Sequence, residues 1–170
     1  MRYPWGINYV SPCMQIRPSL DSDLAAVTEL FTASVHQLAS SDYDAAQCAV
    51  WAPRPPDAEV WRERLSSRQT LVAEEGGSLA GFIAFEEDGH IDLLFTAPSF
   101  ARRGVASLLL QSAESRLSVA GVGGLFTEAS LTARPFFERH GFTVTGEEQV
   151  QRGGVSFRRF AMHKPLRAHR

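Results

Sequence analysis

A short basic loop, Ala101 to Ala106, is the part of the sequence with the clearest capacity to bind a ligand. It reads A-R-R-G-V-A and follows an apolar, strand-forming run from Ile91 to Thr96. Pro98 ends that run because proline has no N–H for a strand ladder, and a helical period of apolar residues begins after Gly104. The first N–H groups of a helix have no internal partner and carry partial positive charge. Strand, basic loop and helix start together predict an anion site, most naturally for phosphate. The alternative that the residues alone leave open is an ordinary strand-to-helix connection with solvated arginines.

These residues resemble motif A of the GNAT acetyltransferases, whose pattern is Q/R-x-x-G-x-G/A after an L-[YF]-V-x-P strand end. The strand end here is Leu94 to Pro98, and Ala101 departs from the pattern because glutamine or arginine is usual there. The resemblance implies that the backbone amides of the loop hold the pyrophosphate of acetyl-CoA. The cofactor-binding residues that it implies in this segment are Leu94, Phe95, Thr96, Arg102, Arg103, Gly104, Val105, Ala106 and Ser107.

A second segment, Ser130 to Phe142, reads S-L-T-A-R-P-F-F-E-R-H-G-F. It resembles the GNAT motif N-x-x-A-x-x-F-Y-E-K-x-G-F at matching spacing, and its wording is also similar to that of the YafP-like branch. The resemblance implies that Ser130, Phe136 and Phe137 lie at the cofactor. Ser130 replaces an asparagine, and a serine still offers one donor. Phe137 replaces the tyrosine that protonates the leaving thiolate in many members, and a phenyl ring cannot do so.

The activity that the resemblance implies is an N-acetyltransferase using acetyl-CoA as cosubstrate and no metal. The acetyl group would pass directly, within a ternary complex, to a primary amine of a small molecule or a peptide N-terminus. Two alternatives stay open. One is a non-catalytic module that binds or senses acyl-CoA, and the other is an acetyltransferase acting on a macromolecular, protein- or RNA-linked acceptor.

Direct transfer needs a base that removes a proton from the amine and a donor for the developing oxyanion. Backbone N–H groups near Leu94 to Thr96 are the expected oxyanion donors. Asp92 is the predicted base, because it lies two residues before Leu94, where some members carry a catalytic glutamate. A solvated or hydrogen-bonded aspartate at a strand start is the alternative. Further candidates for the base are Glu86, Glu128, His90 and His36. Cys48 as an acyl-carrying nucleophile is disfavoured, since no base is visibly paired with it.

The acceptor side is predicted ahead of the sheet, where this family usually places short helices joined by a variable loop. Residues from Tyr43 to Val50 are compatible with a short helix, and a proline-rich stretch follows it. The substrate-binding candidates are His36, Tyr43 and Trp51. The alternative is that these side chains only pack the helices together. Arg152, Arg158 and Arg159 form a further group, either a site for an acidic substrate or a solvated hairpin face.

Length and composition fit one globular domain of 170 residues with 44% hydrophobic and 21% charged residues. A net charge of −2 gives no reason to expect nucleic acid. No apolar run is long enough for a membrane span, and two cysteines without a pairing pattern favour a cytoplasmic location.

The predicted fold class is α/β, in the α+β sense. The resemblance implies a single-domain GNAT fold over residues 14–165, with tails at 1–13 and 166–170. Its central sheet is expected to be mixed and mostly antiparallel, with a splayed strand pair and helices on both faces. A homodimer through the C-terminal strands is common in the family.

Overall fold

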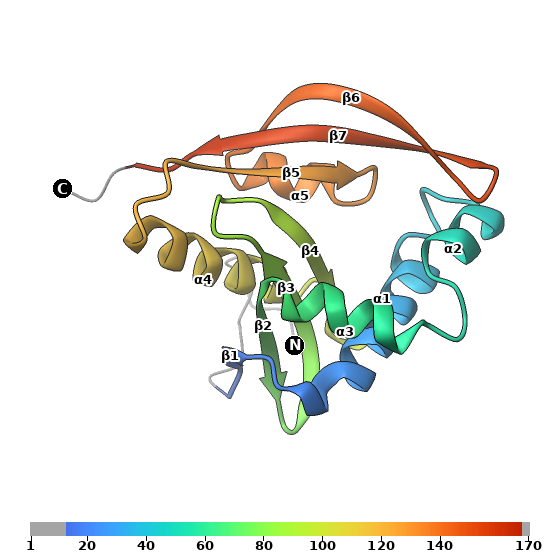
Figure 1. The fold of residues 1–170 in the computed structure, drawn as a ribbon, viewed down its shortest axis with the longest axis horizontal. Coiled ribbons are helices and arrows are strands. Elements are labelled where there is room, and N and C mark those ends of the chain that lie inside the picture. The colour runs from blue at the N-terminus through green and yellow to red at the C-terminus, as the bar shows by residue number, and fades with distance from the viewer. Residues whose placement is uncertain (1–12, 168–170) are drawn as a thin grey trace, which may run out of the picture.

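The computed structural model describes residues 13–167, which form two antiparallel sheets flanked by helices (Figure 1). Most of the predicted N-terminal tail therefore lies outside the described residues. The strands are β1 (Gln15–Pro18), β2 (Gln69–Glu75), β3 (Ser78–Phe85), β4 (Ile91–Thr96), β5 (Gly124–Ser130), β6 (Thr143–Arg152) and β7 (Val155–Pro165). The α-helices are α1 (Leu24–Leu38), α2 (Ala45–Trp51), α3 (Ala58–Ser66), α4 (Val105–Val119) and α5 (Arg134–Arg139). Two short 3-10 turns, Asp21–Asp23 and Pro98–Phe100, precede α1 and α4.

The first sheet has the strand order β1-β2-β3-β4, and every neighbouring pair is antiparallel. A hairpin turn at Gly76 and Gly77 joins β2 to β3, and both glycines have the positive φ that such turns require. The pairing of β3 with β4 shifts register between Ala84 and Phe85. This shift leaves Asp92 as the extra residue of a bulge, a feature often found beside active sites.

The second sheet, in the order β5-β7-β6, meets the first only at one end. A single parallel bridge joins His90 to Phe126, and the two strands then separate, as Figure 1 shows for β4 and β5. The close contact depends on Gly89, where a Cβ atom would lie 2.2 Å from the carbonyl oxygen of Gly124. The splayed strand pair implied by the family resemblance is therefore β4 and β5.

Two buried clusters lie on opposite faces of the first sheet. One includes Leu71 and Ile83 from the strands and Leu109 from α4, and the other includes Val72 and Phe82 with Phe31 of α1. Alternate residues of β2 and β3 thus enter different clusters, as the period-two geometry of a strand requires. Burial on both faces explains why these strands are almost continuously apolar, and it confirms helices on both faces.

The C-terminal end of the fold extends slightly past β7. The N–H of Leu166 donates to the carbonyl oxygen of Gly123 at 2.9 Å, and its side chain packs against the cluster under α4. Within residues 13–167, no helix is both long and apolar enough to cross a membrane.

Candidate active site

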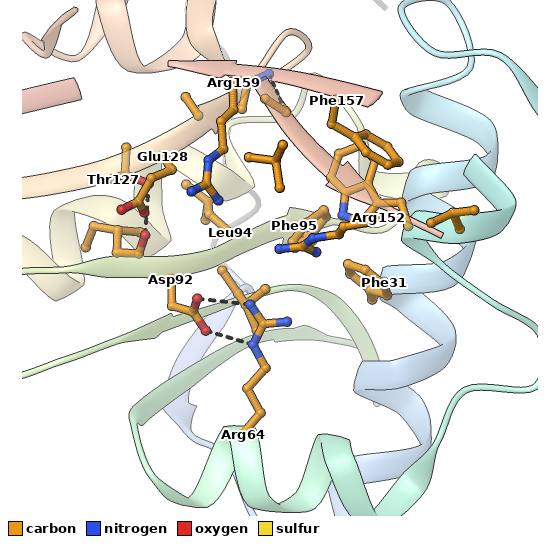
Figure 2. Close-up of a pocket in the computed structure, with 18 of the residues that line it drawn as sticks. Phe31, Arg64, Asp92, Leu94, Phe95, Thr127, Glu128, Arg152, Phe157 and Arg159 are labelled. Carbon is orange, nitrogen blue, oxygen red and sulfur yellow. Dashed lines mark hydrogen bonds and ion pairs between the residues drawn. The ribbon is translucent and has the colours of Figure 1, made fainter. Parts of the chain in front are cut away.

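A cavity of about 590 Å³ opens where β4 and β5 separate. Its walls come from both sheets, from the α1–α3 region and from the β6–β7 hairpin (Figure 2). The residues predicted from the sequence that line it are Asp92, Leu94, Phe95, Ser130, Phe137, Tyr43 and Trp51, together with the further candidates His90, Glu128, Arg152, Arg158 and Arg159. Helical and strand segments far apart in the chain therefore converge on one space.

The edge of β4 supplies backbone groups to this cavity. The N–H of Ala97 donates to the carbonyl oxygen of Ala80 in β3 at 2.8 Å. Alternate residues of an antiparallel strand direct their backbone N–H and C=O groups to the same neighbouring strand. The backbone groups of Phe95 therefore also point toward β3. The N–H and C=O groups of Leu94 and Thr96 point to the other side of β4, toward β5, and β5 diverges from β4 at this position. These polar groups are available to a ligand.

The start of α4 lies beside that edge. Gly104 immediately precedes the helix with φ +80°, and Arg102 also has a positive φ of +60°. Val105 is 1% exposed and packs on β3 at Gly81, where a Cβ atom would lie 2.8 Å from both the Val105 side chain and the Phe95 carbonyl oxygen. The missing side chain at Gly81 thus lets the first turn of α4 approach the sheet.

The two arginines of the loop differ in their contacts. The Arg103 guanidinium lies 3.1 Å from the Glu75 carboxylate and 5.0 Å from the centre of the Phe100 ring. Arg102 is exposed and forms no ion pair with any residue that the structure describes. Glu75 thus offsets the charge of Arg103, whereas the backbone N–H groups of the first turn of α4 have no partner within the helix.

Helix α5 joins the same region through Ser107 and His140. The Nδ1 of His140 donates to the carbonyl oxygen of Phe136 at 2.8 Å, so in the neutral ring Nε2 accepts from the Ser107 hydroxyl at 2.9 Å. Phe136 stacks on the His140 ring at 4.2 Å, whereas Phe137 is 3% exposed and packs on Phe142. Sequence reasoning had no signal for the contact between Ser107 and His140.

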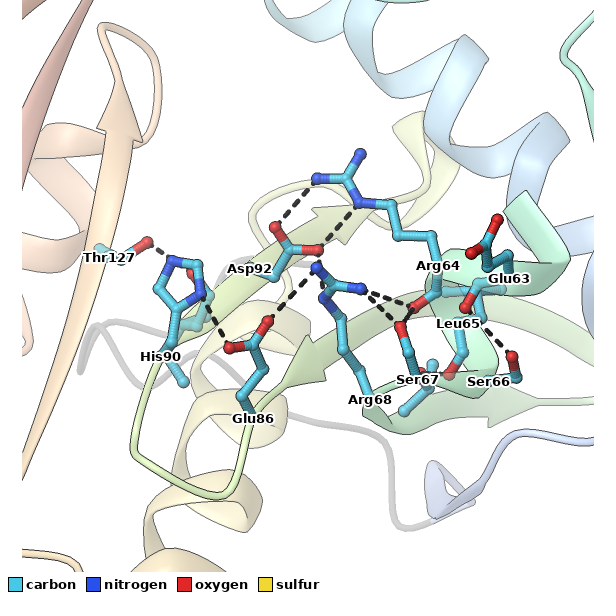
Figure 3. A network of polar contacts seen from close by, with 12 residues as sticks. Glu63, Arg64, Leu65, Ser66, Ser67, Arg68, Glu86, His90, Asp92 and Thr127 are labelled. Atoms are coloured by element: carbon cyan, nitrogen blue, oxygen red, sulfur yellow. Dashed lines mark hydrogen bonds and ion pairs between the residues drawn. The ribbon is translucent and has the colours of Figure 1, made fainter. Parts of the chain in front are cut away.

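Asp92 is held by two arginines (Figure 3). Its two carboxylate oxygens accept from Arg64 at 2.9 Å each, and the Arg68 Nε lies 2.8 Å from Oδ2. The side chain is 12% exposed. The surroundings are thus strongly cationic although the strand is apolar. Neither arginine was predicted as a site residue, because both lie on or just after α3, far from Asp92 in the sequence.

Glu128 and His90 form the next pair along the splay. The Nε2 of His90 donates to the Glu128 carboxylate at 2.7 Å, and its Nδ1 lies 3.7 Å from Glu86. Glu86 in turn lies 3.3 Å from Arg68, so a continuous polar network runs from Arg64 to Glu128. Glu128 and His90 both line the cavity. They come from different sheets, and only the meeting of β4 with β5 brings them together.

Of the three acceptor-side candidates, two line the cavity and one does not. His36 is not among the residues lining the cavity, and its Nε2 donates to the Ala52 carbonyl oxygen at 2.8 Å. Tyr43 is 5% exposed, and its hydroxyl accepts from the Leu131 N–H at 2.9 Å. Burial raises the pKa of Tyr43 above its ordinary value. Trp51 contacts the Tyr43 ring edge-on at 5.2 Å and is half-buried.

Cys48 is buried at 3% exposure, and its thiol points at backbone carbonyl oxygens of Val35 and Tyr43. Burial raises the pKa of this thiol, which opposes the thiolate form that a nucleophile needs. Among residues 13–167, no cluster of three or more histidine, cysteine or acidic side chains could hold a metal ion.

Comparison with known proteins identifies the family to which this chain belongs. The model of an acetyltransferase (GNAT) domain matches residues 39–164. The chain belongs to the GNAT acetyltransferase family. An uncharacterized N-acetyltransferase of Escherichia coli, YafP, is 37% identical over 156 residues, covering 89% of this chain and 97% of that protein. The predicted family, its YafP-like branch and the fold class are thereby confirmed.

Two solved GNAT structures have the same fold. A GCN5-related N-acetyltransferase from Rhodopseudomonas palustris is 30% identical with a TM-score of 0.88, covering 93% of this chain and 99% of that one. The PaiA N-acetyltransferase from Thermoplasma acidophilum, solved in complex with coenzyme A, is 20% identical with a TM-score of 0.72, covering 90% and 99%. At that identity the second likeness concerns the fold alone.

Proposed function

We propose that this protein transfers the acetyl group of acetyl-CoA directly to a primary amine of a small molecule or a peptide N-terminus. The observation that carries the proposal is the cavity at the splay of β4 and β5. One wall offers backbone groups suited to a phosphate-bearing, extended molecule, and the opposite wall offers aromatic and charged side chains. Membership of the GNAT family supports acetyl-CoA as the donor.

The residues of the first wall fit this cosubstrate. The first turn of α4 has N–H groups without helical partners, and Gly104 leaves space for an anion to reach them. The outward backbone groups of Leu94 and Thr96 can pair with the amides of a pantetheine arm, as a free strand edge pairs with any extended chain. Bound acetyl-CoA supplies a thioester carbonyl as the electrophile.

In the transfer, the amine nitrogen bonds to the thioester carbonyl carbon, the C–S bond breaks with its electrons going to sulfur, and the amine gives up a proton. Asp92 stays a prediction as the base for that proton. Its oxygens are occupied by guanidinium donors, which leaves them poorly placed to accept a proton. Glu128 lines the same cavity and is oriented by His90, so the contacts favour Glu128 for this role.

The second candidate function is a non-catalytic module that binds acyl-CoA. The observation favouring it is Phe137, which is buried and cannot protonate a leaving thiolate. Turnover separates the two functions. An enzyme releases thiol from acetyl-CoA only when an amine is added, whereas a binding module releases none.

The direct test is calorimetric titration of the full chain with acetyl-CoA and, in parallel, with coenzyme A lacking its 3′-phosphate. We expect acetyl-CoA to bind with a dissociation constant of about micromolar order, followed by amine-dependent thiol release across a panel of amines. Absence of binding would contradict the proposed function. Binding without thiol release from any amine would favour the binding module.

A further inference from the structure

The β6–β7 hairpin turns one of its faces toward the cavity. In its register Val150 pairs with Phe157, and Arg152 pairs with Val155. Side chains opposite each other in a sheet share a face, and Val150, Arg152, Phe157 and Arg159 all line the cavity. An arginine and an aromatic side chain are thus presented to the acceptor side by a single element.

The tip of this hairpin is fixed in place by α2. The side-chain amide of Gln47 donates to the Ser156 carbonyl oxygen at 3.0 Å, and the backbone at Gly153 approaches Val50 so closely that a Cβ atom would lie 3.3 Å from it. Figure 1 shows the hairpin tip above α2. The contacts with α2 therefore fix the backbone position of Arg152, which lies next to the turn.

Most charges around the cavity are already paired. Arg64 is bound by Asp92, and Arg159 lies 2.7 Å from Glu148. The Arg158 guanidinium lies 2.6 Å from Glu147 and holds the pKa of that carboxyl below its ordinary value. Glu128 accepts from His90. Each of these groups has a partner of opposite or complementary character.

Arg152 is different, because its side chain forms no ion pair or hydrogen bond with any residue in 13–167 that the structure describes. Figure 2 shows its guanidinium pointing into the cavity beside Phe95. An arginine that enters a binding cavity without an acidic partner is a positive charge that the ligand can complement. Guanidinium groups match carboxylates with two parallel hydrogen bonds.

Aromatic rings line the same cavity as Arg152. The Phe157 and Tyr43 rings lie 6.0 Å apart, and the Trp51 and Phe95 rings 6.2 Å apart. These rings offer apolar surface to the part of the ligand that joins its charged groups, and Arg152 itself is exposed.

We propose that Arg152 binds a carboxylate of the acceptor, so that the acceptor carries both the reacting amine and a carboxylate. This inference rests on the proposed function and narrows its substrate class. A free amino acid and a peptide with an acidic side chain share this chemistry. The paired acceptors of the test separate these two sources of the carboxylate.

The test measures thiol release with acceptors that differ only in the carboxylate. One pair is phenylalanine and phenylalaninamide, and the other is alanyl-glutamate amide and alanyl-glutamine amide. We expect the wild-type protein to prefer the carboxylate member of at least one pair. Arg152→Gln should raise KM for that member about 10- to 100-fold, the effect of losing a charge-assisted hydrogen-bond pair, and leave kcat unchanged. KM for the neutral member should change less than about threefold.

Arg116→Gln is the matched control, because it removes an exposed arginine of α4 that does not line the cavity. It should leave both members of each pair unaffected. A binding readout independent of turnover is calorimetry of N-acetylphenylalanine and its amide in the presence of coenzyme A, where Arg152→Gln should weaken only the acid.

The possible failures are distinguishable. Equal use of acids and amides, with no effect of Arg152→Gln, would overturn the inference and leave the acetyltransferase standing. Cofactor binding without thiol release from any acceptor would overturn the proposed function, and this inference with it.

Discussion

The two walls of the cavity are built in different ways. The proposed cofactor-side wall consists of the β4 edge, the basic loop and the first turn of α4, which are continuous in the chain from Leu94 to Ser107. The proposed acceptor-side wall combines α1, α2, α3, β5 and the β6–β7 hairpin, and its first and last elements are more than about a hundred residues apart in the chain. The first wall presents mainly backbone groups, whereas the second presents side chains.

This difference explains why only one wall has a recognisable motif. Backbone N–H groups at a helix start do not depend on most side chains, so Ala101 can replace the usual glutamine or arginine without removing the donors. Side-chain recognition instead depends on each residue and on how distant elements meet. Mutations that alter the backbone should therefore act mainly on the cofactor, and side-chain mutations mainly on the acceptor.

The largest effect is expected for Gly104→Glu. The substitution places a side chain at φ +80° and a negative charge at the predicted phosphate site. Affinity for acetyl-CoA measured by calorimetry should fall more than about 100-fold, because several phosphate contacts are lost together. Gly121→Glu is the control: φ is +83° there and nothing lies within 4 Å of a Cβ atom. Cofactor affinity equal to wild type in Gly104→Glu would refute the placement of the loop.

The next largest effect concerns the base on the acceptor side. Glu128→Gln should lower kcat about 100-fold near neutral pH, the usual contribution of a general base, without changing acetyl-CoA affinity. Asp92→Asn should instead lower the free energy of unfolding by about 1–3 kcal/mol, because it weakens the charge-assisted hydrogen bonds from Arg64 and removes the ion pair with Arg68. Rates and thermal denaturation of both variants check this.

Glu138→Gln is the control for Glu128, since it removes an exposed acid of α5 outside the cavity. The reverse result, a rate loss at full stability in Asp92→Asn and a normal rate in Glu128→Gln, would restore Asp92 as the base.

A smaller effect is expected for Gly81→Ala, because Gly81 lies on β3 and contacts the cofactor-side wall through Val105 and Phe95. The added Cβ atom would lie 2.8 Å from the Val105 side chain and from the Phe95 carbonyl oxygen, so the start of α4 must move away from β4. We expect a loss of about 1–3 kcal/mol in unfolding free energy together with weaker acetyl-CoA binding. Gly123→Ala has open space around its Cβ position and should be close to neutral. Equal stability of the two variants would contradict the close packing of Gly81 against Val105 and Phe95.

The smallest effect tests an acceptor-wall residue through pH. Because burial raises the pKa of Tyr43, the folded protein keeps the phenolic proton at pH values where the unfolded chain has lost it. Stability from this group is complete below the ordinary pKa of about 10 and declines as the pH rises above it. Tyr43→Phe should cost about 1 kcal/mol at pH 7, since the Leu131 N–H loses its acceptor.

Melting temperatures between pH 9 and 11 check that prediction, and the variant should show the shallower decline. Cys48 contributes a decline of the same sign in both proteins, because burial raises its pKa too, so the difference between them isolates Tyr43. Parallel curves would show that the Tyr43 hydroxyl is not protected by burial.

Much of the fold was predictable because its signals are local. The glycine pair after Glu75, the proline after Thr96 and Gly141 after α5 mark turns and ends through their own backbone preferences, and the elements lie where these residues place them. The apolar periods of β3 and α4 likewise identify elements whose burial depends on their own spacing. The bulge at Asp92 and the contact at Gly89 could not be predicted, since each depends on a neighbouring strand.

The sequence by itself determined the family and the elements, and it predicts the cofactor-side loop, because each depends on residues close together in the chain. Only the tertiary structure decided the environment of each acidic group. It placed Arg64 and Arg68 against Asp92, His90 against Glu128, and the exposed Arg152 along the cavity without an acidic partner. Electrostatic environments arise from groups that meet across sheets and helices, and residue spacing within one segment carries no information about such meetings.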